Sequence, residues 1–109
     1  MSQIEQFYEG KALFVTGGTG FIGKVMLEKL LRSTDVRAVY LLIRDKKGLS
    51  SKDRLKSLFN SKLFDILKKE KPHMLQRVIA ISGDIDQPVL GLNEKSLDLV
   101  LNEVGTTSL

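Results

Sequence analysis

Cysteine and tryptophan are absent from this chain of 109 residues, and histidine occurs once. Without cysteine, the chain has no disulfide framework, no thiolate zinc site and no cysteine nucleophile, a composition that suits a reducing compartment. His73 alone cannot form a metal site. No apolar run approaches the roughly 18 to 20 residues of a membrane span, and residues 1–5 do not begin a signal peptide. We therefore expect an intracellular, cytoplasmic chain with no metal and no transmembrane segment.

Proline occurs only twice in a chain that is 42% hydrophobic, which favours one globular domain. Charge is distributed unevenly, because residues 44–77 hold eleven lysines and arginines against four acidic residues. Such a bias attracts phosphate, acyl-CoA or nucleic acid, although a solvated helix face is the simpler interpretation. No aromatic residues alternate with the basic ones, since Phe59 and Phe64 fall on the apolar face. Nucleic acid is therefore not expected as a partner.

Three apolar runs are expected to form buried strands. Residues 11–16 end in a glycine-rich turn, residues 36–43 contain the run Ala-Val-Tyr-Leu-Leu-Ile, and residues 77–82 are followed by Gly83. Continuous apolar runs of this length, closed by glycine or polar residues, are typical of parallel strands that are covered on both faces.

Apolar residues at helical spacing predict helices between and after these strands. The first helix starts at Phe21, and residues 50–71 form one long helix or a broken pair that ends at Lys71-Pro72. Asn93 is a plausible cap for a last helix. The residues expected on the buried faces of the first and last helices are Phe21, Ile22, Val25, Met26, Leu27, Leu30 and Leu31, and Leu97, Val100, Leu101 and Val104.

A glycine-rich turn joins the first strand to the first helix. Residues 16–24 read Thr-Gly-Gly-Thr-Gly-Phe-Ile-Gly-Lys, with glycines in the phase Gly18-x-Gly20-x-x-Gly23. Glycines permit a tight turn and a close approach of phosphate, and the unpaired N–H groups at the start of a helix attract negative charge. We expect a dinucleotide pyrophosphate to bind here, at Thr16, Gly17, Gly18, Thr19, Gly20, Phe21, Ile22 and Gly23.

Two alternative interpretations of this turn compete with the dinucleotide site. A purely structural turn seldom needs so many glycines at the start of a helix. A P-loop matches G-x-x-x-x-G-K through Lys24 but needs a serine or threonine hydroxyl for magnesium at the next position, where Val25 has none. The dinucleotide interpretation is therefore preferred.

Two further positions follow the second and third strands. Arg44 stands where an arginine can pair with the 2′-phosphate of NADP, so we expect NADPH as the cofactor, although Asp45 is adjacent and Arg44 also fits a solvated strand end. Asp84 and Ile85 follow the third strand and are expected to flank the adenine. Gly83-Asp84 fits a simple turn equally well.

The order of strands and helices is that of the N-terminal half of a doubly wound α/β Rossmann fold, with three parallel strands and crossover helices. We divide the chain into a polar lead (1–10), a partial NAD(P)-binding Rossmann domain (11–104) and a divergent tail (105–109), with no second domain. The first strand would be central in the complete fold, so its far edge is unpaired here. We expect marginal stability and a tendency to associate.

The residues resemble one family. The glycine turn with Leu-Glu-Lys-Leu-Leu-Arg at residues 27–32 looks like the start of the fatty acyl-CoA reductases, which are extended short-chain dehydrogenase-like proteins with a male-sterility-type NAD(P)-binding domain. Residues 39–44, Gly83-Asp84 and Leu-Gly-Leu at residues 90–92 agree, and the likeness runs from about residue 8 to about residue 104. Asp45 departs from the expected proline.

The resemblance implies a parent enzyme that reduces long-chain acyl-CoA to a primary fatty alcohol with NADPH, and whose relatives associate with peroxisomal or endoplasmic reticulum membranes. Family catalysis uses a Tyr-x-x-x-Lys pair, whereas Tyr8 and Tyr40 are followed four residues later by Ala12 and Arg44. No catalytic residue is therefore assigned, and the chain alone is expected to be inactive. Fatty acyl-CoA is expected as a partner only in a full-length protein. The alternative is a stand-alone nucleotide-binding or interaction module without catalysis.

Overall fold

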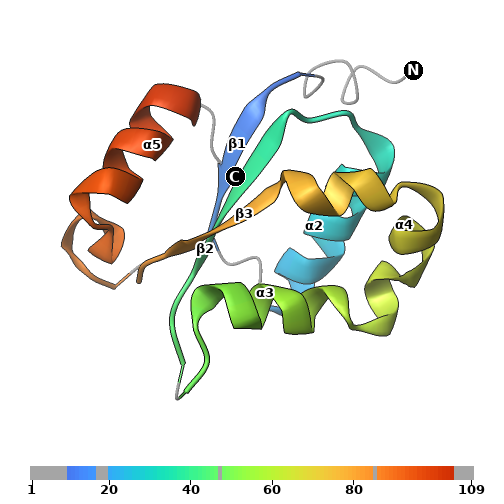
Figure 1. Ribbon diagram of the computed structural model, residues 1–109, viewed down its shortest axis with the longest axis horizontal. Coiled ribbons are helices and arrows are strands. Elements are labelled where there is room, and N and C mark those ends of the chain that lie inside the picture. Colours follow the sequence, from blue (N-terminus) through green and yellow to red (C-terminus); the bar gives the residue numbers. More distant parts are fainter. Residues whose placement is uncertain (1–9, 17–19, 47, 85, 105–109) are drawn as a thin grey trace.

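The computed structural model describes residues 10–16, 20–46, 48–84 and 86–104. Its sheet has three parallel strands in the order β1 (Ala12–Val15), β2 (Ala38–Ile43) and β3 (Val78–Ser82) (Figure 1). Ala12 pairs with Ala38, and Val39 pairs with Val78. The predicted strands are thus confirmed with slightly shorter ends, and β1 lies at an edge.

Helices cover both faces of the sheet (Figure 1). On one side lie α2 (Phe21–Ser33), α3 (Ser51–Phe59) and α4 (Asp65–Glu70), and on the other lies α5 (Glu94–Val104). Short 3-10 turns are η1 (Lys62–Phe64), η2 (Pro72–Arg77) and η3 (Pro88–Gly91). Of the two expectations for residues 50–71, the broken pair is correct, and α4 ends directly before Lys71-Pro72, as predicted.

The core consists of one cluster on each face of the sheet. Every residue of β2 is buried, because alternate side chains enter opposite clusters. Val39 and Leu41 pack with the first cluster, and Tyr40 and Leu42 pack with the second. The first cluster includes Leu13, Leu27, Leu31, Leu58, Phe64, Leu67 and Met74, and the second includes Ala12, Phe14, Ala38, Ile81 and Val100.

Side chains complete the helix ends. Asn93 Oδ1 accepts the Ser96 N–H at 2.7 Å, which confirms the predicted cap of α5. At the C-terminal end of α2, Lys71 Nζ donates to the carbonyl oxygen of the C-cap residue Thr34 at 3.2 Å. Within α2, Arg32 Nε donates to the Glu28 carboxylate at 2.9 Å, and this hydrogen bond, together with the negative charge of Glu28, raises the pKa of Arg32.

The expected buried face of α2 is wrong in its first half. Phe21 and Met26 are 83% and 59% exposed, and Ile22 and Val25 are exposed too, whereas Leu27 and Leu31 are buried. At 100° per residue, the four exposed residues lie on the face of α2 opposite Leu27 and Leu31. The sheet can cover only one of these two faces.

The expected face of α5 is also only partly correct. Val100 is buried and Leu97 is half-buried, but Leu101 is 61% exposed. The side chain of Val104 lies outside the described residues. A single helix on this face of the sheet turns only one stripe inward, and Val100 occupies it. Within the described part of the chain, no helix is long and apolar enough to cross a membrane.

Candidate functional site

The carboxyl ends of the three strands meet at one edge of the sheet, because all three strands run parallel. Thr16 follows β1 and is half-buried, Arg44 follows β2, and Asp84 stands two residues beyond β3. In open α/β sheets this edge is where ligands bind. The predicted site residues that the structure describes are therefore brought to one place.

Gly20 is the N-cap of α2, with φ −75° and ψ 169°, and its carbonyl accepts the Lys24 N–H at 2.9 Å. It has no side chain to cap the helix, and the first turn contains no acidic residue. The N–H groups of the first turn, from Phe21 to Gly23, thus start α2 without a capping carboxylate or hydroxyl from this residue. Such a helix start suits an anion. Gly17, Gly18, Thr19 and Ile85 lie outside the described residues.

Arg44 and Asp84 form an ion pair across the ends of β2 and β3. Arg44 Nη1 lies 3.9 Å from Asp84 Oδ2, with the arginine side chain 68% exposed and the aspartate 25% exposed. The other carboxylate oxygen of Asp84 accepts the Asp86 N–H at 3.0 Å. Asp84 thus makes a local turn contact with Asp86, and the same carboxylate also faces Arg44.

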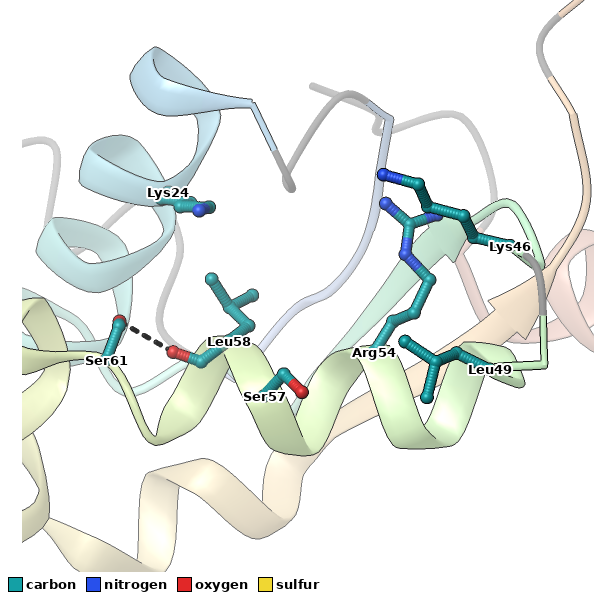
Figure 2. A pocket seen from close by; sticks show the side chains of 7 residues that line it. All are labelled: Lys24, Lys46, Leu49, Arg54, Ser57, Leu58 and Ser61. Carbon is teal, nitrogen blue, oxygen red and sulfur yellow. Dashed lines mark hydrogen bonds between the residues drawn. The ribbon is translucent and has the colours of Figure 1, made fainter.

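A basic pocket lies between α2, α3 and the connection that follows β2 (Figure 2). Its volume is about 250 Å³, and the three cations that line it are Lys24 from α2, Lys46 from the connection and Arg54 from α3. In Figure 2, Lys46 and Arg54 extend toward one another on one side of the pocket, and Lys24 lies on the opposite side. The remaining lining residues are Leu49, Ser57, Leu58 and Ser61.

Hydrogen bonds hold the connection after β2 and the start of α3 together at this pocket. Lys46 and Leu49 exchange two backbone hydrogen bonds, of 3.1 and 2.6 Å. Arg54 Nη1 donates to the carbonyl oxygen of Arg44, so a hydrogen bond joins α3 to the residue that follows β2. Three like charges around one pocket repel each other, and an anion placed among them would relieve that repulsion.

None of these three cations is among the binding residues predicted from the sequence. Lys24 enters only the rejected P-loop match, and Lys46 and Arg54 are not predicted as ligands. Arg44, the predicted ligand of a 2′-phosphate, does not line the pocket and faces Asp84 instead. A signal for Lys24 was present in the sequence, because it directly follows the last glycine of the turn. Arg54 has no such signal, because only the fold brings Arg54 of α3 and Lys24 of α2 to the same pocket.

Comparison with known proteins shows the family of this chain. Residues 15–107 match the family model described as male sterility protein. Fatty acyl-CoA reductase 1 of Mus musculus is 44% identical over 103 residues, and fatty acyl-CoA reductase wat of Drosophila melanogaster is 42% identical over 103 residues. Each alignment covers 94% of this chain and 20% of the relative. The chain thus spans about a fifth of the length of these relatives.

Solved structures show the same fold. The reductase domain of a non-ribosomal peptide synthetase from Mycobacterium tuberculosis superimposes with a TM-score of 0.68 at 28% identity, over 87% of this chain and 22% of that one. The terminal R domain from the myxalamid pathway gives 0.65 at 31% identity, over 88% and 23%. The parallel sheet and the family match along most of the chain lead to one conclusion: this protein belongs to the NAD-binding family described as male sterility protein, and fatty acyl-CoA reductases are similar to it over 94% of its length.

Proposed function

We propose that this chain is the NADPH-binding part of a fatty acyl-CoA reductase, a protein that converts long-chain acyl-CoA to a primary fatty alcohol. One observation supports the choice of NADPH over NADH. Lys24, Lys46 and Arg54 line a pocket between α2, α3 and the connection after β2, at the edge where the adenosine half of a dinucleotide binds. A 2′-phosphate is the group that distinguishes NADPH, and it needs cations of this kind.

Different residues would bind different parts of the cofactor. The start of α2, from Gly20 to Gly23, would hold the pyrophosphate, with the backbone N–H groups and the helix dipole as the attraction. The basic pocket would hold the 2′-phosphate, and Asp84 would lie beside the adenine. Arg44, exposed at the end of β2, is close enough to Asp84 to lie against the same base. The bound cofactor supplies the hydride of the reduction.

Catalysis needs residues that we do not find in this chain. Tyr40 is 5% exposed in the central strand, with Arg44 and not lysine four residues later. Tyr8 lies outside the described residues and is followed four residues later by Ala12. We therefore expect the chain to bind NADPH and not to turn over acyl-CoA. This second expectation is shared by the alternative function, a nucleotide-binding module without catalysis.

Titration calorimetry of the chain with NADPH and with NADH tests the proposal, together with NADPH oxidation in the presence of a long-chain acyl-CoA. We expect NADPH to bind more tightly than NADH, and oxidation to stay at background. Equal affinities would contradict the assignment of NADPH, absence of binding would contradict a cofactor-binding role, and turnover above background would contradict inactivity. Joining the chain to a segment that carries Tyr-x-x-x-Lys should produce NADPH-dependent reduction if the reductase proposal is correct, and no reduction if the chain is a separate module.

A further inference from the structure

Asp45, Ser51 and Ser82 form a hydrogen-bonded group that we name the Asp45 clasp. Asp45 Oδ1 accepts the backbone N–H of Ser51 at 2.9 Å and lies 3.4 Å from Ser82 Oγ. The hydroxyls of Ser51 and Ser82 are 2.7 Å apart. Asp45 follows β2, Ser51 is the first residue of α3, and Ser82 is the last residue of β3. The clasp therefore joins three elements at the edge of the sheet where the cofactor is proposed to bind.

The clasp sets where α3 begins. Ser51 is only 5% exposed, so its N–H needs a partner in the protein, and Asp45 supplies it. A carboxylate at the start of a helix also interacts favourably with the helix dipole. Ser50 Oγ accepts the Asp53 N–H at 3.2 Å and completes the first turn. Loss of Asp45 would leave the first N–H of α3 without its partner.

Two of the pocket cations, Lys46 and Arg54, lie close in sequence to residues of the clasp. Lys46 is the neighbour of Asp45, and Arg54 lies three residues after Ser51, which is one turn of α3. Arg54 also reaches back to the carbonyl oxygen of Arg44, the residue before Asp45. Movement at the start of α3 would therefore shift Lys46 and Arg54 relative to each other.

We infer that Asp45 is a positioning residue for cofactor choice: its carboxylate holds Lys46 and Arg54 in place for the 2′-phosphate and does not accept a ribose hydroxyl. This inference rests on the proposed function. A carboxylate directly after the second strand ordinarily favours NADH, because it binds the 2′-hydroxyl and repels a phosphate. Here its oxygen is bonded to Ser51 N–H and contacts Ser82 Oγ, so the acidic residue supports the basic pocket.

Three variants test the role of Asp45. Asp45→Ala removes the acceptor, Asp45→Asn keeps an oxygen for Ser51 and Ser82 without the charge, and Asp53→Asn removes the same charge from the exposed first turn of α3 outside the clasp. Each is titrated with NADPH, NADH and adenosine 2′,5′-bisphosphate, which carries the 2′-phosphate without the nicotinamide.

We expect Asp45→Ala to weaken NADPH and the bisphosphate by about tenfold, the value of one charge-assisted hydrogen bond, and NADH by much less. Asp45→Asn and Asp53→Asn should bind like the unaltered chain. A larger loss for NADH than for NADPH would show that Asp45 accepts the ribose hydroxyl, and tighter NADPH binding by both Asp45 variants would show simple repulsion. Either result overturns the inference.

A second readout separates position from stability. Amide exchange at Ser51 should be slow in the unaltered chain and in Asp45→Asn, and faster in Asp45→Ala. If Asp45→Ala fails to fold, Ser82→Ala removes the other contact of the same oxygen and should lower NADPH affinity in the same direction, while unchanged affinity would contradict the clasp. If the unaltered chain prefers NADPH and Asp45→Ala keeps that preference, the inference about Asp45 is overturned and the proposed function still stands. An unaltered chain that binds none of the three ligands would overturn the proposed function and this inference with it.

Discussion

Arg44 Nη1 lies 3.9 Å from Asp84 Oδ2, and this pair joins the ends of two neighbouring parallel strands. The arginine is 68% exposed, so the pair itself adds little to stability. Its importance is its place, because Arg44 and Asp84 were both expected to contact the adenosine half of the cofactor. The pair places them beside each other, and Arg44 is not among the residues that line the basic pocket.

Arg44→Ala should weaken NADPH and NADH to the same extent, because Arg44 is proposed to lie against the adenine beside Asp84. The sequence alone predicts a larger loss for NADPH, as for a ligand of the 2′-phosphate, and that result would contradict the placement of Arg44 at the adenine. The larger loss would be about tenfold if the guanidinium forms a charge-assisted bond to phosphate. Calorimetric titration checks it, with Lys69→Ala on the exposed face of α4 as the control. Equal losses for the two cofactors would show that Arg44 contacts the adenine and would leave the 2′-phosphate to the basic pocket.

Arg54→Met and Lys24→Met should each reduce NADPH affinity about tenfold and NADH affinity much less, because each removes one cation from the pocket. Arg54→Lys keeps the charge but loses the fork that reaches the Arg44 carbonyl, so an intermediate loss is expected. Affinity measured from low to high salt supplies a second check. NADPH binding by the unaltered chain should fall with salt more steeply than binding by either Met variant. Parallel salt curves would contradict a phosphate site here.

Gly91→Ala should destabilise the chain and disturb Asp84. Gly91 has a φ of +64°, and an added Cβ would lie 3.3 Å from the backbone nitrogen of Asp84. Gly48→Ala is the matched control, because Gly48 has a φ of +71° and open space around it. Both should lose about 1–2 kcal/mol of unfolding free energy from left-handed strain, and Gly91→Ala should lose more in denaturant unfolding. Equal losses would mean that the Asp84 turn yields to the new methyl group.

Leu31→Ala should cost about 2–5 kcal/mol of unfolding free energy, because the Leu31 side chain is fully buried in the core between α2 and the sheet. Met26→Ala, on the opposite face of α2 and 59% exposed, should change it by less than about 0.5 kcal/mol. Denaturant unfolding of both variants is the measurement. A large loss for Met26→Ala would indicate that the exposed face of α2 is covered in solution.

Self-association is the last expectation. Among the residues that the structure describes, β1 pairs only with β2, and the exposed face of α2 carries Phe21, Ile22, Val25 and Met26. Unpaired strand edges and exposed apolar side chains favour association. Sedimentation at increasing concentration should show species larger than the monomer, and Val25→Lys should reduce them without lowering stability. A monomer at micromolar concentration that unfolds in one sharp cooperative transition would contradict this expectation.

The local signals in the sequence located nearly every element. The apolar runs of β1, β2 and β3, the proline after α4 and the cap at Asn93 each act through neighbours a few residues away, so their outcome can be read from the chain. The break between α3 and α4 was left open, because residues 50–71 keep helical spacing through the 3-10 turn at η1.

The sequence by itself determined the order of the parallel strands, the glycine-rich segment before α2 and the family of the chain. Tertiary structure alone decided which face of α2 is buried, that Arg44 meets Asp84, and that Lys24 and Arg54 share a pocket. The physical reason is distance along the chain. Strand and turn preferences depend on adjacent residues, whereas the partner of a charged side chain depends on which elements the sheet brings together, and Lys24 and Arg54 meet only because α2 and α3 pack on the same face.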